Sequence, residues 1–265
     1  MPGFEWIDEE EKNAVSSIFD NGGVLFAHGF DGMRNGVYHV REFEQAISVK
    51  FKVKHCQAVT SGTAATKVAL KAVGVKPGDE VITQAFNFIA TVEAILDCGA
   101  TPIIANVDRS LNMNPSELAS LVSPKTSAIV PVHMLGVPAD MDPIMAFAKE
   151  KGLPVVEDNC ESVGARYDGG YLGTIGEAGV FSFDHGKIIA TGEGGMVLCN
   201  DHAVFKYANE YQDHGHENNP AFPRGLDTCS TPGFNYRMTE MQAAVGKVQL
   251  SKLDRMLEAN EERYL

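Results

Sequence analysis

The sequence predicts an α/β protein in which a mostly parallel sheet is covered by helices. Seven short apolar runs, bounded by Gly, Pro or Asp, alternate with longer amphipathic segments. Continuous runs rich in Val, Ile and Phe are typical of strands buried on both faces. A chain of 265 residues can also bury one large core without disulfides. The predicted strands are Gln57–Thr60, Glu80–Thr83, Thr101–Ala105, Ala128–Val132, Pro154–Glu157, Gly179–Phe183 and Met196–Asn200.

Capping residues define the helices between these strands. Glycines follow the amphipathic segments Thr63–Val73, Ile89–Cys98 and Asp140–Lys151, and a glycine at this position stops a helix. Start signals are the acidic run from Asp8 to Glu11 and the motif Asn114-Pro115-Ser116-Glu117. An apolar period from Thr239 to the last residue predicts another helix. The polar stretch from Asn209 to Pro232 predicts a long loop, and loops of this length are often functional.

Composition excludes several classes of protein. The 22 basic and 35 acidic residues give a net charge of −13, which disfavours binding to nucleic acid. No segment has the length and hydrophobicity of a membrane span, and the first twenty residues lack the apolar core of a signal peptide. The five cysteines are odd in number and far apart, without a C-x-x-C pair. We therefore expect a cytoplasmic protein without structural disulfides.

Two stretches at strand ends are suited to binding a ligand. In the stretch from Val59 to Thr66 a strand ends in small residues and a helix begins, so free N–H groups and hydroxyls can bind a phosphate. The alternative is an ordinary helix with a Ser or Thr cap. In the stretch from Val155 to Glu161 an apolar strand runs into acidic residues, where open α/β sheets bind ligands. Here the alternative is a cap or a solvated acid.

Lys187 follows another apolar strand and precedes the glycine-rich turn from Thr191 to Gly195. Most lysines are solvated, but one held at the same sheet edge as Asp158 is a candidate for a desolvated amine that forms imines. Further along, Gly233 to Gln242 marks the change from loop to helix, and Thr239 with Gln242 can form a capping box. The pair His214-x-His216 has no further ligands at a suitable spacing, so no metal site is predicted.

In this order, the motifs resemble the DegT/DnrJ/EryC1/StrS family of pyridoxal-phosphate-dependent sugar aminotransferases over nearly the whole chain. The resemblance implies a three-layer α/β/α domain of fold type I with a mostly parallel, seven-stranded sheet, and a homodimer whose active sites are shared. The matching pieces are Glu42-Phe43-Glu44, Ser61–Ala65, Gly78–Thr83, Pro131–Gly136, Asp140-Met141-Asp142, Glu157-Asp158, S-F-x-x-x-K from Ser182 to Lys187, G-E-G-G from Gly192 and N-Y-R-M from Asn235.

The resemblance also gives each site residue a role. Lys187 would hold pyridoxal 5′-phosphate as an imine and then move a proton between the substrate carbon and the cofactor, while Asp158 would keep the pyridine nitrogen protonated. Phe88 matches the aromatic residue that stacks on the ring, although it is equally suited to the core. Glu161 would lie near the phenolic oxygen. The phosphate would be bound by Gly62, Thr63 and Ser182, and by Asn235 of the neighbouring subunit.

The loop from Asp213 to Pro220 and the following Pro223-Arg224 resemble a subgroup that aminates C8 of a 3-deoxy-octulosonate for lipopolysaccharide. The expected reaction passes an amino group from an amino acid, expected to be glutamate, to this keto-sugar. Arg224 or Arg237 would then bind the sugar-acid carboxylate through two parallel hydrogen bonds. His133 is expected to be structural or to lie near the substrate.

Two other functions remain open on the sequence. Dehydratases of the same family carry His in place of the lysine, so Lys187 argues against dehydration, and a non-catalytic relative would not need both Lys187 and Asp158. The resemblance divides the chain into an N-terminal arm with helices (1–50), the cofactor domain (51–240) and the start of a helix (241–265). We expect this helix to lead to a small C-terminal domain that the sequence lacks, because it has no stop signal.

Overall fold

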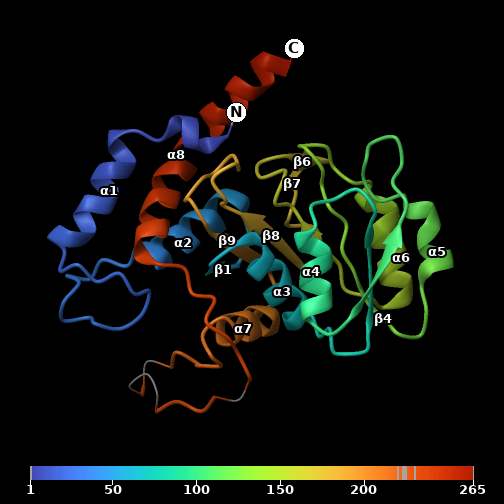
Figure 1. Cartoon of the computed structure of the whole chain (residues 1–265), viewed down its shortest axis with the longest axis horizontal. Coiled ribbons are helices and arrows are strands. Elements are labelled where there is room, and N and C mark those ends of the chain that lie inside the picture. Colours follow the sequence, from blue (N-terminus) through green and yellow to red (C-terminus); the bar gives the residue numbers. More distant parts are fainter. Residues whose placement is uncertain (1, 220, 223–225, 230, 265) are drawn as a thin grey trace.

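A computed structural model describes residues 2–219, 221–222, 226–229 and 231–264 of the chain (Figure 1). All seven predicted strands form, with boundaries that differ by a few residues from those expected. They are β1 (His55–Val59), β2 (Glu80–Gln84), β3 (Thr101–Ala105), β4 (Thr126–Ile129), β5 (Val156–Asp158), β8 (Ala178–Ser182) and β9 (Gly195–Cys199). A separate hairpin consists of β6 (Arg166–Tyr167) and β7 (Gly170–Tyr171).

The seven strands lie side by side in the order β3-β2-β4-β5-β8-β9-β1. Strands β4 and β5 are joined by parallel bridges from Ile129 to Val155 and from Val132 to Asp158. The Asp158 N–H donates to the Pro131 carbonyl at 2.9 Å, which continues this pairing to the strand ends. Strand β9 runs antiparallel to both of its neighbours, β8 and β1, whereas the other neighbouring pairs in this sheet are parallel. The mostly parallel, seven-stranded sheet is thus confirmed.

Helices cover both faces of this sheet, because successive strand residues point to opposite sides. Val180 and Val197 contribute to the cluster beneath α3 (Gly62–Ala72), α4 (Ala90–Asp97) and α7 (His202–Tyr211). Phe181 and Met196, the next residues along their strands, pack on the other face beneath α2 (His39–Phe51) and α8 (Glu240–Tyr264). On that face, α6 (Met141–Lys151) covers the part of the sheet that contains Ile129 and Val155. The predicted three-layer α/β/α arrangement is thus confirmed.

Most of the predicted helix ends are found. Asp8 forms a capping box with Glu11 at the start of α1 (Glu9–Asp20). Gly74, Gly99 and Gly152 all have positive φ at helix ends, where glycine is free of the strain that a Cβ brings. Asn114 caps only a short turn, η2 (Pro115–Glu117), which continues into the four-residue helix α5 (Leu118–Leu121).

Helix α7 corrects the predicted start of the long loop. The helix continues to Tyr211, so the loop begins at Gln212 and not at Asn209. Asp201 caps α7 by accepting the N–H groups of Ala203 and Val204. The buried side of α7 includes Glu210, which is 3% exposed, and this acid interrupts the apolar period that would have marked the helix.

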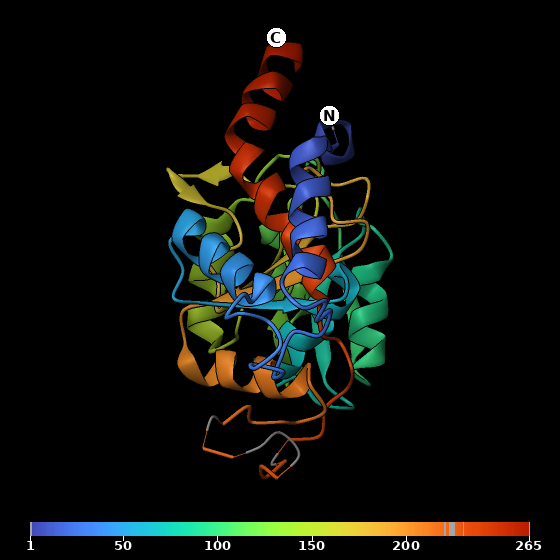
Figure 2. The ribbon, with the colours of Figure 1, turned by 90° about the vertical axis from the view of Figure 1, so that its left-hand side faces the viewer.

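The N-terminal segment, η1 (Gly3–Trp6) and α1, lies along α8 on the outside of the sheet layers (Figure 2). Buried Glu11 accepts hydrogen bonds from Lys252 at 2.9 Å and from Gln249 at 2.8 Å. The Gly3 N–H donates to the Lys187 carbonyl at 2.7 Å. The arm is therefore fixed to α8 and to the loop that carries Lys187. None of the described helices is both long and apolar enough to cross a bilayer.

Candidate active site

A cavity of about 330 Å³ opens where the carboxyl ends of β1, β5 and β8 meet. This volume lies in the range of small-molecule sites, about 300–1,000 Å³. Parallel strands bring their carboxyl ends to one edge, so residues far apart in the chain line the same space. Seven of the predicted site residues do so: Gly62, Thr63, Phe88, Asp158, Glu161, Ser182 and Lys187.

One side of the cavity is the N-terminus of α3. Ser61 caps this helix by accepting the Ala64 N–H at 3.1 Å, and the Ala65 N–H makes the first intrahelical bond. The preceding N–H groups of Gly62 and Thr63 are therefore available to an anion. A Cβ at Gly62 would lie 2.7 Å from the Ser182 Cβ, which explains why glycine is needed here. Backbone donors and the Ser182 hydroxyl thus surround one end of the cavity.

Asp158 ends β5 with its side chain only 5% exposed. Its Oδ2 accepts the Thr91 hydroxyl at 2.7 Å, and its Oδ1 accepts the Cys160 N–H at 3.1 Å. These two bonds fix the orientation of the carboxylate in the cavity wall. A buried, oriented carboxylate of this kind is suited to holding a proton on a basic nitrogen of a ligand.

Lys187 faces Asp158 across the cavity from the loop after β8. Its ammonium group forms an ion pair with Glu161, and both side chains are about one-quarter exposed or less. The Lys187 N–H donates to the Asp184 carbonyl at 2.9 Å, which closes a turn and directs the lysine toward the cavity. The lysine predicted from its position past an apolar strand therefore contacts Glu161 and lines the same cavity as Asp158.

Phe88 lies in the segment between β2 and α4 and is 66% exposed. It lines the cavity, so the alternative that it belongs to the core is wrong. An exposed ring at the mouth of such a cavity is available to stack on a planar ligand.

Three other predicted residues do not line the cavity. His133 is fully buried: its Nε2 is 3.1 Å from Glu157, and its Nδ1 accepts the Ala139 N–H at 3.1 Å, so the structural alternative holds and substrate contact does not. Arg237 pairs with the buried Asp213 at 2.5 Å and does not line the cavity. Asn235 is exposed outside the cavity of its own chain. Arg224 lies outside the described residues.

The sequence did not single out several residues of the cavity wall. Thr91 has the clearest part, since it holds Asp158, but a threonine in the first turn of a helix is too common to be a signal by itself. Cys160 lines the wall as well. Burial and the nearby Asp158 charge raise the pKa of its thiol well above the usual value, so it stays protonated and is no nucleophile. Asp184 and Glu193 complete the polar lining.

Comparison with known proteins agrees with this geometry. Residues 7–265 match the model of the DegT/DnrJ/EryC1/StrS aminotransferase family. GDP-perosamine synthase of Caulobacter vibrioides is 42% identical over 221 residues, which are 83% of this chain and 58% of that protein. The chain thus spans little more than half the length of this relative.

Solved structures give the same result. The aminotransferase from Psychrobacter cryohalolentis superposes with a TM-score of 0.85 at 36% identity, over 94% of this chain and 63% of that one. The Escherichia coli GDP-4-keto-6-deoxy-D-mannose-3-dehydratase, solved with bound hydrated PLP, gives 0.84 at 27% identity over 94% and 66% of the two chains. The chain belongs to the DegT/DnrJ/EryC1/StrS aminotransferase family.

Proposed function

We propose that this protein is a pyridoxal-phosphate-dependent aminotransferase that moves an amino group from an amino acid to a keto-sugar. The observation that carries the proposal is the convergence of Lys187, Asp158 and the N-terminus of α3 on one cavity. An amine, a buried acid and a phosphate-sized anion site are the three groups that this cofactor requires.

The cavity residues fit the cofactor. Gly62 keeps the space beside Ser182 open, where a Cβ would intrude, so a phosphate can approach the N–H groups of Gly62 and Thr63. Asp158 is oriented by Thr91 and is placed to pair with the ring nitrogen. Phe88 offers its exposed ring for stacking, and Lys187 supplies the amine for covalent attachment.

Each residue then has a defined task in the reaction. When bound, the cofactor supplies an electron sink for the carbanion formed at the substrate carbon. Asp158 holds a proton on the ring nitrogen, which keeps that sink effective. As the neutral amine, Lys187 would accept a proton at Nζ from the substrate carbon and then deliver it to the cofactor. Glu161, which pairs with Lys187, would stabilise the ammonium form between these two transfers.

For the substrate, we propose an 8-oxo-3,8-dideoxy-manno-octulosonate, aminated with glutamate as donor during lipopolysaccharide biosynthesis in the cytoplasm. The keto-sugar class is supported by the family and by the GDP-perosamine synthase relative. The specific sugar is supported by the motif between Asp213 and Arg224. Arg224 or Arg237 would bind the sugar-acid carboxylate, and Arg237 would have to exchange its present partner Asp213 to do so.

The whole protein is proposed to be a homodimer with shared sites and three regions. Residues 1–50 form the arm and first helices, residues 51–240 hold the cofactor, and residues 241–265 lead toward a further small domain. The exposed position of Asn235, outside the cavity of its own chain, supports a role at a neighbouring site. The greater length of the matched relatives supports the further domain.

A dehydratase is the second candidate, because one of the structural neighbours is a dehydratase. Lys187 separates the two, since the family's dehydratases resemble this chain but carry His in place of the lysine. A lysine that can move a proton between the substrate carbon and the cofactor favours transamination over loss of water.

Absorption spectroscopy and peptide mass analysis test the function. Protein loaded with pyridoxal phosphate should be yellow, and borohydride should fix the cofactor mass on the peptide with Lys187. Lys187→Ala should abolish this label, whereas Lys12→Ala, which changes an exposed surface lysine, should keep it. Colourless protein that takes up no cofactor would refute every catalytic function. Release of 2-oxoglutarate from glutamate with a keto-sugar distinguishes transamination from dehydration.

A further inference from the structure

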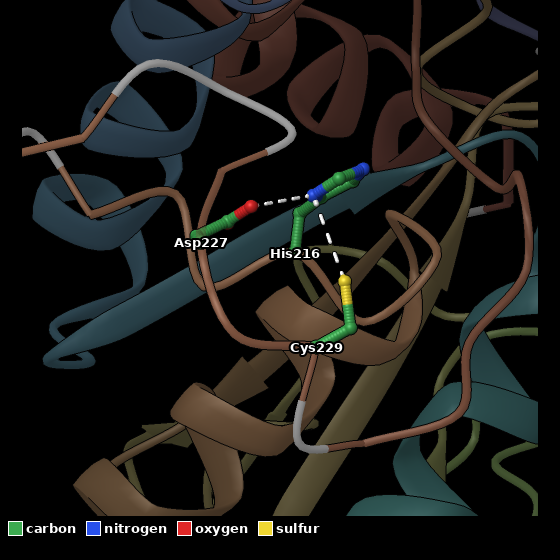
Figure 3. Close-up of side chains that lie close together, drawn as sticks. All are labelled: His216, Asp227 and Cys229. Carbon is green, nitrogen blue, oxygen red and sulfur yellow. Dashed lines mark hydrogen bonds and ion pairs between the residues drawn. The ribbon is translucent and has the colours of Figure 1, made fainter.

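We propose that the loop between α7 and Asn235 contains a site for a divalent cation of the zinc class, bound by His216, Asp227 and Cys229. These three side chains come from the two arms of the loop and turn toward one another (Figure 3). They lie outside the lining of the cofactor cavity. The proposed metal site is thus separate from the cofactor cavity.

The distances between the donor atoms suit one shared ion. His216 Nδ1 is 2.9 Å from Asp227 Oδ1 and 3.9 Å from Cys229 Sγ, and all three donor atoms lie within 4.8 Å of one another. Bond lengths of 2.0–2.3 Å to a tetrahedral zinc ion place its ligands roughly 3.3 to 3.7 Å apart. Shifts of about 1 Å or less in the side chains would therefore complete the coordination.

The backbone of the loop holds these ligands in place. Gly215 has φ +84° and lies so close to the Thr231 carbonyl that a Cβ would overlap it, which brings the two arms of the loop together. The His216 N–H donates to the Asp213 carbonyl at 2.9 Å, which closes a turn that ends at His216. The Asn218 N–H donates to Asp227 Oδ2 at 3.3 Å, which leaves Oδ1 directed at His216. Such supporting bonds orient metal ligands.

The donor set determines the class of ion. Imidazole, thiolate and carboxylate together are typical of zinc and similar transition metals, whereas magnesium and calcium prefer oxygen ligands alone. Binding would release the Cys229 thiol proton and leave His216 Nδ1 as a neutral donor. The charges of Asp227 and the Cys229 thiolate then balance those of a divalent ion. Cys229 is exposed, so water can occupy the fourth position.

The fold, and not local spacing, supplies this site. The pair His214-x-His216 suggested two adjacent ligands, but His214 is exposed and is no member of the cluster. The structure instead adds Asp227 and Cys229 from the returning arm of the loop. A bound ion would link the two arms ahead of Asn235, the residue proposed to reach the neighbouring subunit.

Cobalt and zinc titrations of tag-free, metal-free full chain test the site. We expect one equivalent of Co²⁺ to bind with a thiolate charge-transfer band in the near ultraviolet, and Zn²⁺ to displace it. Cys229→Ser should lose the band. Loss of a residue that only supports a metal ligand weakens metal binding roughly tenfold to hundredfold, so His216→Ala, which removes a ligand itself, should weaken it by at least as much. His214→Ala is the matched control and should bind as the parent does.

A second measurement covers the case in which a variant folds poorly. In the parent protein, which carries no substitution, Zn²⁺ should slow the alkylation of Cys229. Mass spectrometry of the peptide that contains Cys229 measures this rate. The proposal is wrong if Zn²⁺ leaves alkylation of Cys229 unchanged. It is equally wrong if Cys229→Ser keeps the cobalt band, or if His214→Ala loses binding as completely as His216→Ala.

Discussion

Gly62 shows how closely the cavity wall is packed at the scale of one residue. Its missing side chain would meet the Ser182 Cβ at 2.7 Å, the Ser182 Oγ at 3.0 Å and the Cys160 Sγ at 3.1 Å. The three neighbours belong to rigid parts of the sheet edge, so they cannot move aside without cost. The first turn of α3 therefore approaches the cavity only because residue 62 is glycine.

Gly62→Ala should weaken binding of pyridoxal phosphate. Overpacking of this kind costs about 1–3 kcal/mol, which corresponds to a loss of roughly fivefold to a hundredfold in affinity if the strain falls on the bound state. Absorption titration of cofactor-free protein measures the dissociation constant. Gly32→Ala is the control, because a Cβ there meets nothing within 4 Å. Equal affinity of the two variants would contradict a phosphate site at α3.

Glu44 is a second residue with a specific environment. It lies on α2 and accepts the Ala58 N–H of β1 at 2.8 Å. Burial raises the pKa of this carboxyl from 4.5 to about 7. The folded state thus binds the Glu44 proton more tightly than the unfolded state, and the stabilisation is lost as the pH rises from about 4.5 through 7.

The free energy of unfolding should accordingly fall between pH 5 and pH 7.5 more steeply in the parent than in Glu44→Gln, which cannot titrate. Between these two pH values the parent should lose at most roughly 3 kcal/mol more of its free energy of unfolding than Glu44→Gln does, because one titrating group contributes about 1.4 kcal/mol per pH unit. Urea unfolding at several pH values measures it. Parallel curves for the two proteins would show that Glu44 does not titrate in this window.

At the scale of elements, the N-terminal arm supports the loop that carries Lys187. The Gly3 N–H binds the Lys187 carbonyl at 2.7 Å, and the Phe4 ring stacks on His185 with centroids 4.5 Å apart. The Lys252 ammonium holds the arm to α8 by donating to the Trp6 carbonyl at 3.0 Å. The backbone around Lys187 is thus fixed from outside the cavity.

Gly3→Ala should release this arm. A Cβ at Gly3 would lie 2.6 Å from the Gln249 Oε1 and closer still to the Ile188 carbonyl. Trp6, the single tryptophan, has its indole nitrogen buried, so release should shift its fluorescence to longer wavelength. We also expect faster proteolysis near residue 7 and a loss of about 1–3 kcal/mol in stability. An unshifted spectrum would mean that the arm tolerates the methyl group. Gly32→Ala again serves as control.

The elements also show which patterns in the sequence are informative. Strands β5 and β8 were predictable because their apolar runs are buried on both faces, and the glycines after α3 and α6 marked helix ends by their backbone freedom. Helix α7 was obscured because Glu210 occupies a buried position on it. Glu210 pairs with Lys206 one turn earlier on the helix, and it also accepts the Thr231 hydroxyl at 3.0 Å. The second contact joins residues 21 positions apart, so a local pattern cannot reveal it.

At the scale of the whole molecule, a shared cavity was predictable because parallel strands present their carboxyl ends at one edge, and seven of its lining residues were named from the sequence. The contacts between the lining residues were not predictable. Thr91 and Asp158 are 67 residues apart, and their hydrogen bond depends on how α4 packs beside β5. The position of β9 between β8 and β1, antiparallel to both, likewise follows from the chain path and not from its composition.

The last prediction concerns the assembly. If Asn235 binds the phosphate at a neighbouring subunit, a mixture of Lys187→Ala and Asn235→Ala should contain hybrid dimers in which one site has both native residues. Random exchange makes half of the dimers hybrid, so about a quarter of all sites should be native. The two parent variants alone should have none. Retention of pyridoxal phosphate after gel filtration counts these sites without requiring activity.

Subunit exchange must be shown in the same experiment, for example by mass labelling of one variant. If exchange is established and cofactor retention equals the average of the two variants, Asn235 does not contribute to the site of the neighbouring subunit. Recovery to about a quarter would instead require two chains to build each site, because no single chain in the mixture has both residues. The exposure of Asn235, outside the cavity of its own chain, leads us to expect this recovery.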